Sequence, residues 1–529
     1  MQQGLYQWWQ HGIVYEVYVR SFSDSNGDGV GDLAGIREKL DYLAWLGVDA
    51  LWLSPIYPSP MADFGYDVAD YTDVDPLFGK LKDMDALIEA AHSRGLKIIL
   101  DFVPNHSSNQ HPWFLESKSS RDNPKRDWYI WKDGKGDGPP NNWLGSFGGS
   151  AWTWDETTQQ YYCHAFLPEQ PDLNWRNPEV RKAMYAAMQF WLERGVDGFR
   201  MDVLWHLIKD EAFRDNPVNP DYRAGDIPYN SLVPAYSTDQ PEVHTIVQEM
   251  RNLLDRYKER VLIGEIYLPI RRLVAYYGAD KDGAHLPFNF QLITLPWKAS
   301  QVSAAVSEYE GALPPGAWPN WVLGNHDQPR IASRVGLEQA RVAAMLLLTL
   351  RGTPTLYYGD EIGMRDAAIA PEEIRDPQGI NVGVSRDPER TPMQWARAPG
   401  AGFSSGRPWL PLAVDYYRVN VESEREDRYS MLSLYRRLIE LRRKSAALNV
   451  GSYTPVVSEG DVIAYVREAG GERYLALLNL GHRPYSFSLE NVGEGEIVIA
   501  TDIERERERV AGRIRLSGDD GVLVRLDPK

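Results

Sequence analysis

The sequence predicts an α/β protein whose larger part is a (β/α)8 TIM barrel, with an inserted subdomain after strand 3 and a C-terminal antiparallel β domain. First, continuous apolar, β-branched segments alternate with amphipathic helical segments, which is typical of a parallel sheet covered on both faces. Second, eight such strand segments precede Tyr453, the number found in this type of barrel. Third, after Tyr453 short strands follow one another without helices, which indicates a separate β domain.

Eight segments have the composition of barrel strands. They cover residues 12–22, 50–55, 96–103, 197–203, 261–266, 287–292, 319–323 and 353–358. Apolar residues at helical spacing predict helices over residues 33–46, 84–94, 179–194, 242–257 and 431–444. In the last part of the chain we expect short strands over residues 462–466, 474–479, 496–500 and 522–526.

Residues 105–173 interrupt the alternation. They are rich in Trp, Gly, Pro and Asn, show no helical period and form a segment far longer than an ordinary connection. We therefore predict four parts: the first part of the barrel (1–104), an inserted subdomain (105–173), the second part of the barrel (174–452) and a C-terminal β-sandwich domain (453–529).

The composition narrows the possible partners. The 529 residues include 57 Lys and Arg against 74 Asp and Glu, a formal net charge of −17. This excess of negative charge argues against nucleic acid or an anionic membrane surface as a partner. We see no secretory signal and no apolar run of about 18 residues, the length needed to span a membrane. Cys163 is the only cysteine, so we expect a cytoplasmic protein without an intrachain disulfide, either a monomer or a small homo-oligomer.

Polar side chains follow several predicted strands at the end where a barrel of this type carries its chemistry. Arg200 and Asp202 are two residues apart on one strand, so both point to the same face. With Asp202, Glu265 and Asp327 at successive strand ends, three carboxylates are expected at one mouth. Such a set suits acetal hydrolysis, in which one group attacks and another protonates the leaving oxygen. Taken singly, each residue also has an ordinary structural interpretation, such as a cap, a turn residue or a self-contained buried ion pair.

Four segments resemble the signature regions of the α-amylase family of glycoside hydrolases. They are Asp101-x-x-x-Asn105-His106, Gly198-Phe199-Arg200-x-Asp202, Glu265 and Asn325-His326-Asp327. The segment Gln170-Pro171-Asp172-Leu173-Asn174 is similar to a fifth region in the form typical of the α-glucosidase and oligo-1,6-glucosidase branch. The resemblance implies a catalytic barrel with an insertion after strand three and a C-terminal β domain.

The resemblance also implies roles for individual residues. Asp202 is expected to be the nucleophile, Glu265 the general acid/base and Asp327 a transition-state stabiliser that binds ring hydroxyls. Arg200 is expected to hold Asp202 ionised by lowering its pKa. The remaining residues expected to bind the substrate are Asp63, Tyr66, His106, Phe166, His326 and Arg386, with Arg386 as the ion partner of Asp63. An ordinary exposed ion pair is the alternative for Asp63 and Arg386.

Residues 24–32 alternate oxygen ligands as a calcium loop does. Position twelve of this loop is Gly35 rather than glutamate, so it is not an EF-hand. By resemblance we expect a structural calcium or magnesium ion here, and no organic cofactor; the alternative is an acidic turn-rich loop. The expected ligands are Asp24, Asn26, Asp28, Val30 and Asp32.

The function implied is that of a retaining, exo-acting α-glucosidase on short isomaltose-, maltose-, sucrose- or trehalose-type substrates, with transglucosylation as a possible side activity. A sucrose isomerase or glucosyltransferase of the same family shares the three carboxylates, but the Arg-Leu-Asp-Arg-Asp loop of the isomerases is absent from the sequence. A non-catalytic relative, like the ectodomain of amino-acid transporter heavy chains, is a remote alternative, because its membrane anchor is not found and the carboxylates are intact.

Val203 directly follows the predicted nucleophile. In this branch, valine at that position tends to accompany α-1,6 cleavage, whereas alanine or threonine accompanies α-1,4 cleavage. A β-branched side chain is stiff about χ1 and narrows the entry to the leaving-sugar subsite. We expect a preference for isomaltose-type substrates; the alternative is that Val203 only packs in the barrel.

Overall fold

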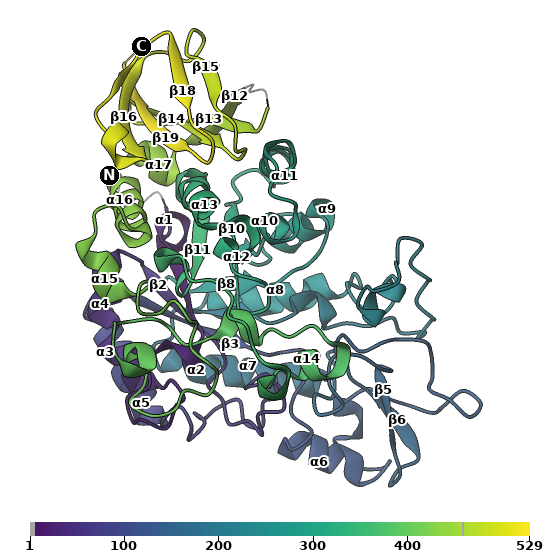
Figure 1. Cartoon of the computed structure of the whole chain (residues 1–529). Helices are drawn as coiled ribbons and strands as arrows, with labels where there is room; N and C mark the ends of the chain where they lie inside the picture. The colour runs from purple at the N-terminus through teal and green to yellow at the C-terminus, as the bar shows by residue number, and fades with distance from the viewer. Residues whose placement is uncertain (1–5, 457–459, 529) are drawn as a thin grey trace.

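The computed structural model describes residues 6–456 and 460–528. Its centre is an eight-stranded parallel sheet with the strand order β10-β11-β1-β2-β3-β7-β8-β9 (Figure 1). The strands are β1 (Val14–Val17), β2 (Ala50–Leu53), β3 (Lys97–Phe102), β7 (Gly198–Met201), β8 (Val261–Gly264), β9 (Leu286–Pro287), β10 (Asn320–Val322) and β11 (Thr353–Tyr357). Each of the eight predicted segments contains or overlaps one of them, which confirms the barrel.

The sheet nearly closes between its two outer strands. Pro287 ends β9 and has no N–H to contribute to a ladder. The side chain of Asn320, in β10, connects the two strands in place of a backbone ladder. Its amide nitrogen donates to the Pro287 carbonyl, and its oxygen accepts from the Asn289 N–H at 2.9 Å. The strand predicted over 287–292 is therefore wrong beyond residue 287, and residues 291–294 form helix α10 instead.

Helices surround the sheet. They are α1 (Trp8–His11), α2 (Val19–Phe22), α3 (Leu33–Glu38), α4 (Leu40–Leu46), α5 (Leu81–His92), α7 (Pro178–Glu193), α8 (Val243–Leu254), α9 (Ile270–Leu273), α10 (Gln291–Thr294), α11 (Ala299–Ala312), α12 (Ile331–Val335), α13 (Leu337–Thr349), α14 (Pro377–Val382), α15 (Val421–Glu426), α16 (Met431–Lys444) and α17 (Ala446–Val450). The predicted helix over 431–444 is confirmed to the residue.

Two predicted elements near the N-terminus are corrected. The strand predicted over 12–22 ends at Val17, because its pairing with β11 stops at Glu16 and its pairing with β2 stops at Val17. One turn of helix, α2, follows. The helix predicted over 33–46 is divided into α3 and α4 at Lys39, whose ψ of 0° departs from helical geometry.

The barrel interior is lined by apolar side chains along most of the strands and by polar side chains at their carboxyl ends. Alternate side chains of the strands, including Val14, Trp52, Ile99 and Val261, pack together inside the barrel. The intervening side chains pack outward against the helices. At the carboxyl ends the inward positions change to charged residues, and this change positions the site described below.

The segment after β3 carries α6 (Pro112–Ser119) and a three-stranded sheet in the order β4-β6-β5, formed by Trp131–Lys132, Gln160–Cys163 and Trp152–Asp155. The sequence shows no helical period in this segment, but the prediction that it therefore contains no helix is wrong. α6 begins with Pro112 at its first position and buries only Phe114 and Ser117, so no apolar stripe reveals it in the sequence. This segment lies at the opposite end of the molecule from the C-terminal sheets (Figure 1).

The C-terminal part is antiparallel, as predicted. A six-stranded sheet has the order β12-β13-β14-β19-β16-β17, and β15 pairs with β18. These strands are β12 (Ser452–Val456), β13 (Val462–Ala469), β14 (Glu472–Asn479), β15 (Tyr485–Ser488), β16 (Gly495–Ala500), β17 (Arg509–Val510), β18 (Arg513–Leu516) and β19 (Gly521–Leu526). Side chains of both sheets, among them Leu475 and Phe487, share one apolar core.

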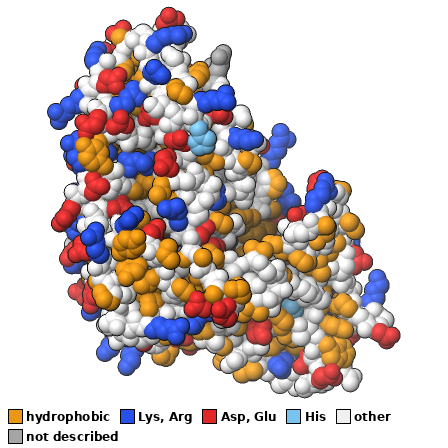
Figure 2. All heavy atoms as spheres, in the orientation of Figure 1, with side chains coloured by type: hydrophobic (Ala, Val, Ile, Leu, Met, Phe, Trp, Pro, Cys, Tyr) orange, Lys and Arg blue, Asp and Glu red, His pale blue; other side chains and the backbone are white. Residues whose placement is uncertain are grey.

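Acidic and basic side chains are interspersed over the face shown in Figure 2. Among the described residues, none of the helices combines the length and apolar character needed to cross a bilayer.

Candidate active site

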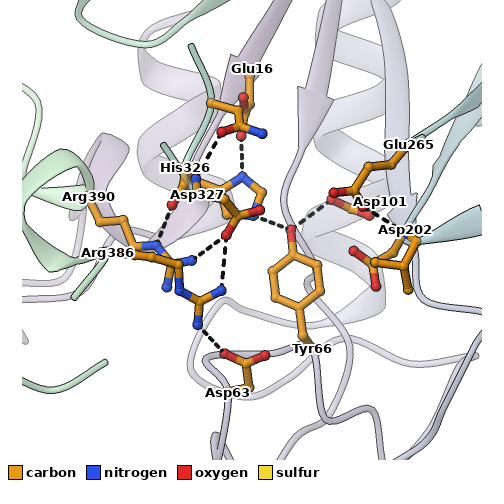
Figure 3. Close-up of polar contacts among 12 residues, drawn as sticks. Glu16, Asp63, Tyr66, Asp101, Asp202, Glu265, His326, Asp327, Arg386 and Arg390 are labelled. Carbon is orange, nitrogen blue, oxygen red and sulfur yellow. Dashed lines mark hydrogen bonds and ion pairs between the residues drawn. The ribbon is translucent and has the colours of Figure 1, made fainter. Parts of the chain in front are cut away.

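Arg200 is the centre of one side of the site. It is fully buried and comes from β7, whose inward face it shares with Asp202. Its Nη1 donates to Asp101 at 2.9 and 3.0 Å and to Asp202 at 2.9 Å. Its Nη2 lies 2.8 Å from Oε2 of Glu265, at the end of β8. One guanidinium thus holds three carboxyl groups, two of them the predicted nucleophile and acid. Figure 3 shows Asp101, Asp202 and Glu265 close to one another.

Burial dominates the protonation of this side. Burial raises the pKa of Asp202 well above its usual range, Glu265 raises it further, and the Arg200 cation opposes the rise. The net shift is opposite in sign to the one expected from the arginine contact alone. Burial also raises the pKa of Glu265, against the lowering effect of Arg200. A raised pKa suits a group that must carry a proton at neutral pH.

The backbone at Val203 is strained. Its φ of 37° and ψ of 48° place a β-branched residue in the left-handed region, which such residues rarely adopt. This conformation aims the Val203 N–H at Oε2 of Glu265, at 2.8 Å. The backbone thus positions the predicted acid, an example of local strain kept at a functional site.

Two arginines hold the other side of the site. Asp327 accepts from Arg386 at 3.0 Å and from Arg390 at 2.9 Å. Arg386 also donates to Asp63 at 2.8 Å (Figure 3) and to Asp376 at 2.7 Å. The Asp63–Arg386 pair is buried, so the interpretation as an ordinary exposed pair is wrong.

Burial acts on Asp327 as well, but the cations outweigh it. The pKa of Asp327 lies below its usual range because the neighbouring His326 ring, followed by Arg386 and Arg390, stabilises the carboxylate more than burial destabilises it. Burial lowers the pKa of His326, so this ring contributes no full charge at neutral pH. Asp63 differs, since burial raises its pKa to about 6 despite Arg386.

These groups surround a pocket of about 150 Å³. The residues that line it are Asp63, Tyr66, His106, Phe147, Phe166, Asp202, Val203, Glu265, Tyr267, Asp327, Gln328, Gln378 and Arg386. Eight of the ten residues predicted for catalysis and substrate binding are among them. The other two, Arg200 and His326, lie behind the pocket wall and contact it through Asp202 and through Tyr66 and Asp327.

Sequence reasoning missed part of the wall. Tyr267 and Gln328 follow Glu265 and Asp327 closely, so the spacing could have indicated them. Phe147 and Gln378 come from long connections without a recognisable pattern. Arg390 and Asp376 were missed for the same reason, because their contacts join segments far apart in the chain.

The loop 24–32 is held by its own side chains. Asp24 accepts from the N–H groups of Asn26, Gly27 and Gly29, and Asp32 accepts from Ser25 and Gly35. Asn26 and Asp28 are exposed. Among the residues that the structure describes, no cluster of three or more His, Cys, Asp or Glu side chains is placed to hold a metal ion. A site here needs the amide oxygen of Asn26 and the Val30 carbonyl, so the metal stays a prediction.

Known proteins resemble the chain over most of its length. The model of the alpha-amylase catalytic domain matches residues 16–451. A probable alpha-glucosidase of Rhizobium meliloti is 42% identical, with 89% of each chain covered. An oligo-1,6-glucosidase of Halalkalibacterium halodurans is 39% identical, with 91% of this chain and 92% of the relative covered.

Two solved structures share the whole architecture. The alpha-glucosyl transfer enzyme XgtA superposes with a TM-score of 0.93 at 41% identity, covering 99% of this chain and 100% of the other. The trehalulose synthase MutB from Pseudomonas mesoacidophila superposes with a TM-score of 0.91 at 35% identity and the same coverage.

Proposed function

The chain belongs to the alpha-amylase family of glycoside hydrolases, and we propose that it removes single glucose units from the ends of short α-glucosides with retention of configuration. It is an enzyme of the α-glucosidase type. The observation that carries the proposal is the pairing of Asp202 and Glu265 on one guanidinium inside a small pocket.

In the proposed first step, an Asp202 oxygen attacks the anomeric carbon of the terminal glucose while Glu265 gives its proton to the departing glycosidic oxygen. The bond to the leaving sugar breaks and a glucosyl ester of Asp202 forms. In the second step Glu265 takes a proton from water, the water oxygen attacks the anomeric carbon and Asp202 is released. Carboxyl groups on neighbouring nitrogens of one guanidinium favour the short spacing of retaining enzymes.

The pocket supports action on chain ends. Its volume of about 150 Å³ is well below the roughly 300–1,000 Å³ of sites for drug-sized ligands, which favours one sugar ring. The buried contacts of Arg386 with Asp63 and Asp327 form one wall, where they can bind the hydroxyls of the terminal glucose. Phe147 and Phe166 add apolar surface for the sugar faces.

A hydrolysis panel tests this proposal. We expect glucose, released first as the α anomer in proton NMR spectra, from isomaltose, maltose, maltotriose, sucrose and trehalose in differing proportions. Cleavage within starch chains, giving mixed oligosaccharides, would contradict a closed pocket. The β anomer as first product would contradict retention.

The similarity to XgtA and MutB makes glucosyl transfer the second candidate. In transfer, a sugar hydroxyl takes the place of water in the second step. The sucrose reaction separates the candidates: equal glucose and fructose indicate hydrolysis, whereas an isomeric disaccharide of glucose and fructose indicates transfer.

We further propose that loop 24–32 binds a structural calcium or magnesium ion through Asp24, Asn26, Asp28, Asp32 and the Val30 carbonyl. The oxygen-bearing side chains of Asn26 and Asp28, which are exposed, support this. The ion would rigidify the loop, which Ser404 also contacts through Asp24, and would take no part in the chemistry.

We also propose a cytoplasmic protein that acts as a monomer or small homo-oligomer without nucleic acid or membrane partners. The single, buried Cys163 supports a reducing compartment, and the net charge of −17 supports the lack of polyanionic partners. Cell fractionation and size-exclusion chromatography with light scattering test these points.

A further inference from the structure

Glu16 is a buried carboxyl group for which the proposed mechanism has no role. It lies in β1, is 0% exposed and shares the inward face of the barrel with Val14. Its Oε1 is 2.5 Å from Nδ1 of His326, 310 positions further along the chain. Its Oε2 is buried without a hydrogen-bond partner. A full charge in this place is costly, so the protonation of Glu16 needs an explanation.

A chain of contacts leads from Glu16 to the pocket (Figure 3). On the other side of the His326 ring, Nε2 lies 2.7 Å from the Tyr66 hydroxyl and 3.4 Å from Oδ2 of Asp327. The Tyr66 hydroxyl also lies 3.0 Å from Oδ2 of Asp101. Tyr66 and Asp327 line the pocket, whereas Glu16 and His326 stand behind it.

The donors and acceptors along this chain of contacts determine which nitrogen atoms of His326 carry a proton. The Tyr66 hydroxyl has one proton to donate, and Asp101, which is ion-paired with Arg200, is its charged acceptor. Tyr66 must then accept its second contact, so Nε2 of His326 carries a proton. Nδ1 and Oε1 of Glu16, 2.5 Å apart, share one further proton. Whichever atom holds that proton, the pair of Glu16 and His326 is neutral overall.

We propose that Glu16 is a positioning residue for the glucosidase reaction: by sharing one proton with His326, it keeps Nε2 a hydrogen-bond donor toward Tyr66 and Asp327. The inference rests on the proposed function of the site. If the shared proton were lost, one tautomer of His326 would turn the Nε2 lone pair toward the Asp327 carboxylate. Tyr66 would then donate to His326, and Asp101 would lose a hydrogen bond.

The surroundings agree with a shared proton. Burial, Asp327 and Asp101 raise the pKa of Glu16 well above its usual range, against Arg200, and burial lowers the pKa of His326. Both directions favour a neutral pair over two charges. The ring of Tyr18 lies 5.4 Å from that of His326 at an interplanar angle of 16°, which restricts rotation of the imidazole.

Three substitutions test the proposal in the full-length protein. Glu16→Gln provides an amide that donates to Nδ1 and so keeps the proton on Nε2. Glu16→Met has a similar size but no hydrogen bond, and Glu16→Asp keeps the acid but withdraws it from Nδ1. We expect kcat/KM for p-nitrophenyl α-glucoside to stay within about threefold of wild type for Glu16→Gln and to fall about 10- to 100-fold for the other two, mainly in kcat. Melting temperatures check that each variant is folded.

A double-mutant cycle with Tyr66→Phe separates positioning from general packing. Because Glu16 acts through His326 on Tyr66, we expect Glu16→Met to cost less in the Tyr66→Phe background than in wild type. Wild-type activity in Glu16→Met, an equal loss in folded Glu16→Gln, or strict additivity in the cycle would each overturn the proposal. An inactive wild type would instead contradict the proposed function.

Discussion

Arginine side chains stand at the centre of both sides of the pocket, but in different numbers. On the reacting side, Arg200 alone serves Asp101, Asp202 and Glu265. On the binding side, Arg386 and Arg390 together serve Asp63, Asp327 and Asp376, and Arg386 contacts all three of these carboxylates.

The pKa shifts follow this difference. All three carboxyl groups of the reacting side have raised pKa values, because burial outweighs a single cation. On the binding side, burial is outweighed at Asp327 and Asp376, whose pKa values are lowered. In the proposed mechanism Glu265, whose pKa is raised, exchanges a proton, and Asp327, whose pKa is lowered, binds as a fixed charge.

The largest effect is expected on the reacting side. Asp202→Asn keeps the shape of the side chain but cannot form the glucosyl ester, so kcat should fall on the order of 10⁴-fold or more. Circular dichroism should show an intact fold. Asp255→Asn, at a half-exposed surface carboxylate, is the matched control and should be fully active. Activity of Asp202→Asn within tenfold of wild type would exclude it as the nucleophile.

On the binding side, we expect a substitution to weaken the binding of the substrate. Arg386→Ala leaves Asp63 and Asp376 without their closest cation. Removing one partner of a buried ion pair lowers the free energy of unfolding by about 3–5 kcal/mol. We expect KM to rise and kcat/KM to fall about 100-fold in steady-state kinetics. Arg428→Ala removes an exposed pair with Glu504, and its effect on stability should stay within about 1 kcal/mol. Equal kinetics for both variants would remove Arg386 from the substrate site.

Asp63 provides a pH test of the binding side. Its pKa is about 6 in the folded protein, against 3.8 for an ordinary aspartate. The folded state therefore binds more protons than the unfolded state between these values, and stability falls as the pH rises through this window. The difference of about 2 units corresponds to about 3 kcal/mol at most.

Urea unfolding at several pH values between 4 and 6 measures this contribution. Asp63→Asn should flatten the slope of unfolding free energy against pH, since the amide does not titrate. An unchanged slope in the variant would show that other groups carry the pH dependence.

Val203 directly follows Asp202 and lines the pocket between the two sides. Val203→Ala should raise the maltose-to-isomaltose ratio of kcat/KM about tenfold, in line with the 1–3 kcal/mol that a methyl-sized change in a pocket contributes. Alanine also avoids the β-branch in the left-handed conformation, so thermal stability should not fall. An unchanged ratio, or a strong maltose preference already in the wild type, would leave Val203 with a packing role only.

The smallest effect concerns the loop 24–32, which lies outside both clusters. A chelator should lower the melting temperature by a few degrees, and added calcium or magnesium should restore it, because a ligand of the folded state stabilises that state. Asp24→Asn should abolish this response. No bound metal in elemental analysis and unchanged melting would identify the loop as an acidic turn held by its own amides.

Much of the reacting side could be predicted from local sequence. Arg200 and Asp202 share a strand face through the period of two, and Glu265 follows a strand whose carboxyl end meets the same mouth. On the binding side, the same rule places Asp327 at the end of β10. Less of the binding side could be predicted from local sequence. Asp63 and Arg386 were predicted as a pair by resemblance alone, and Asp376 and Arg390 gave no signal, because long connections carry no periodicity.

The sequence by itself determined the eight strands, the antiparallel C-terminal part and the residues that end at the barrel mouth, since side-chain periods of 2 and 3.6 are local properties of the chain. Only the tertiary structure decided the end of β1 at Val17, the helix α6, the contact between Glu16 and His326 and the sign of the Asp202 shift. The physical reason is that none of the four is set by local sequence alone. Strand length depends on partner strands, α6 has no apolar stripe of its own, and protonation depends on burial and on charges from segments far away in sequence. The distances between these segments, including that between Glu16 and His326, are set only when the barrel closes.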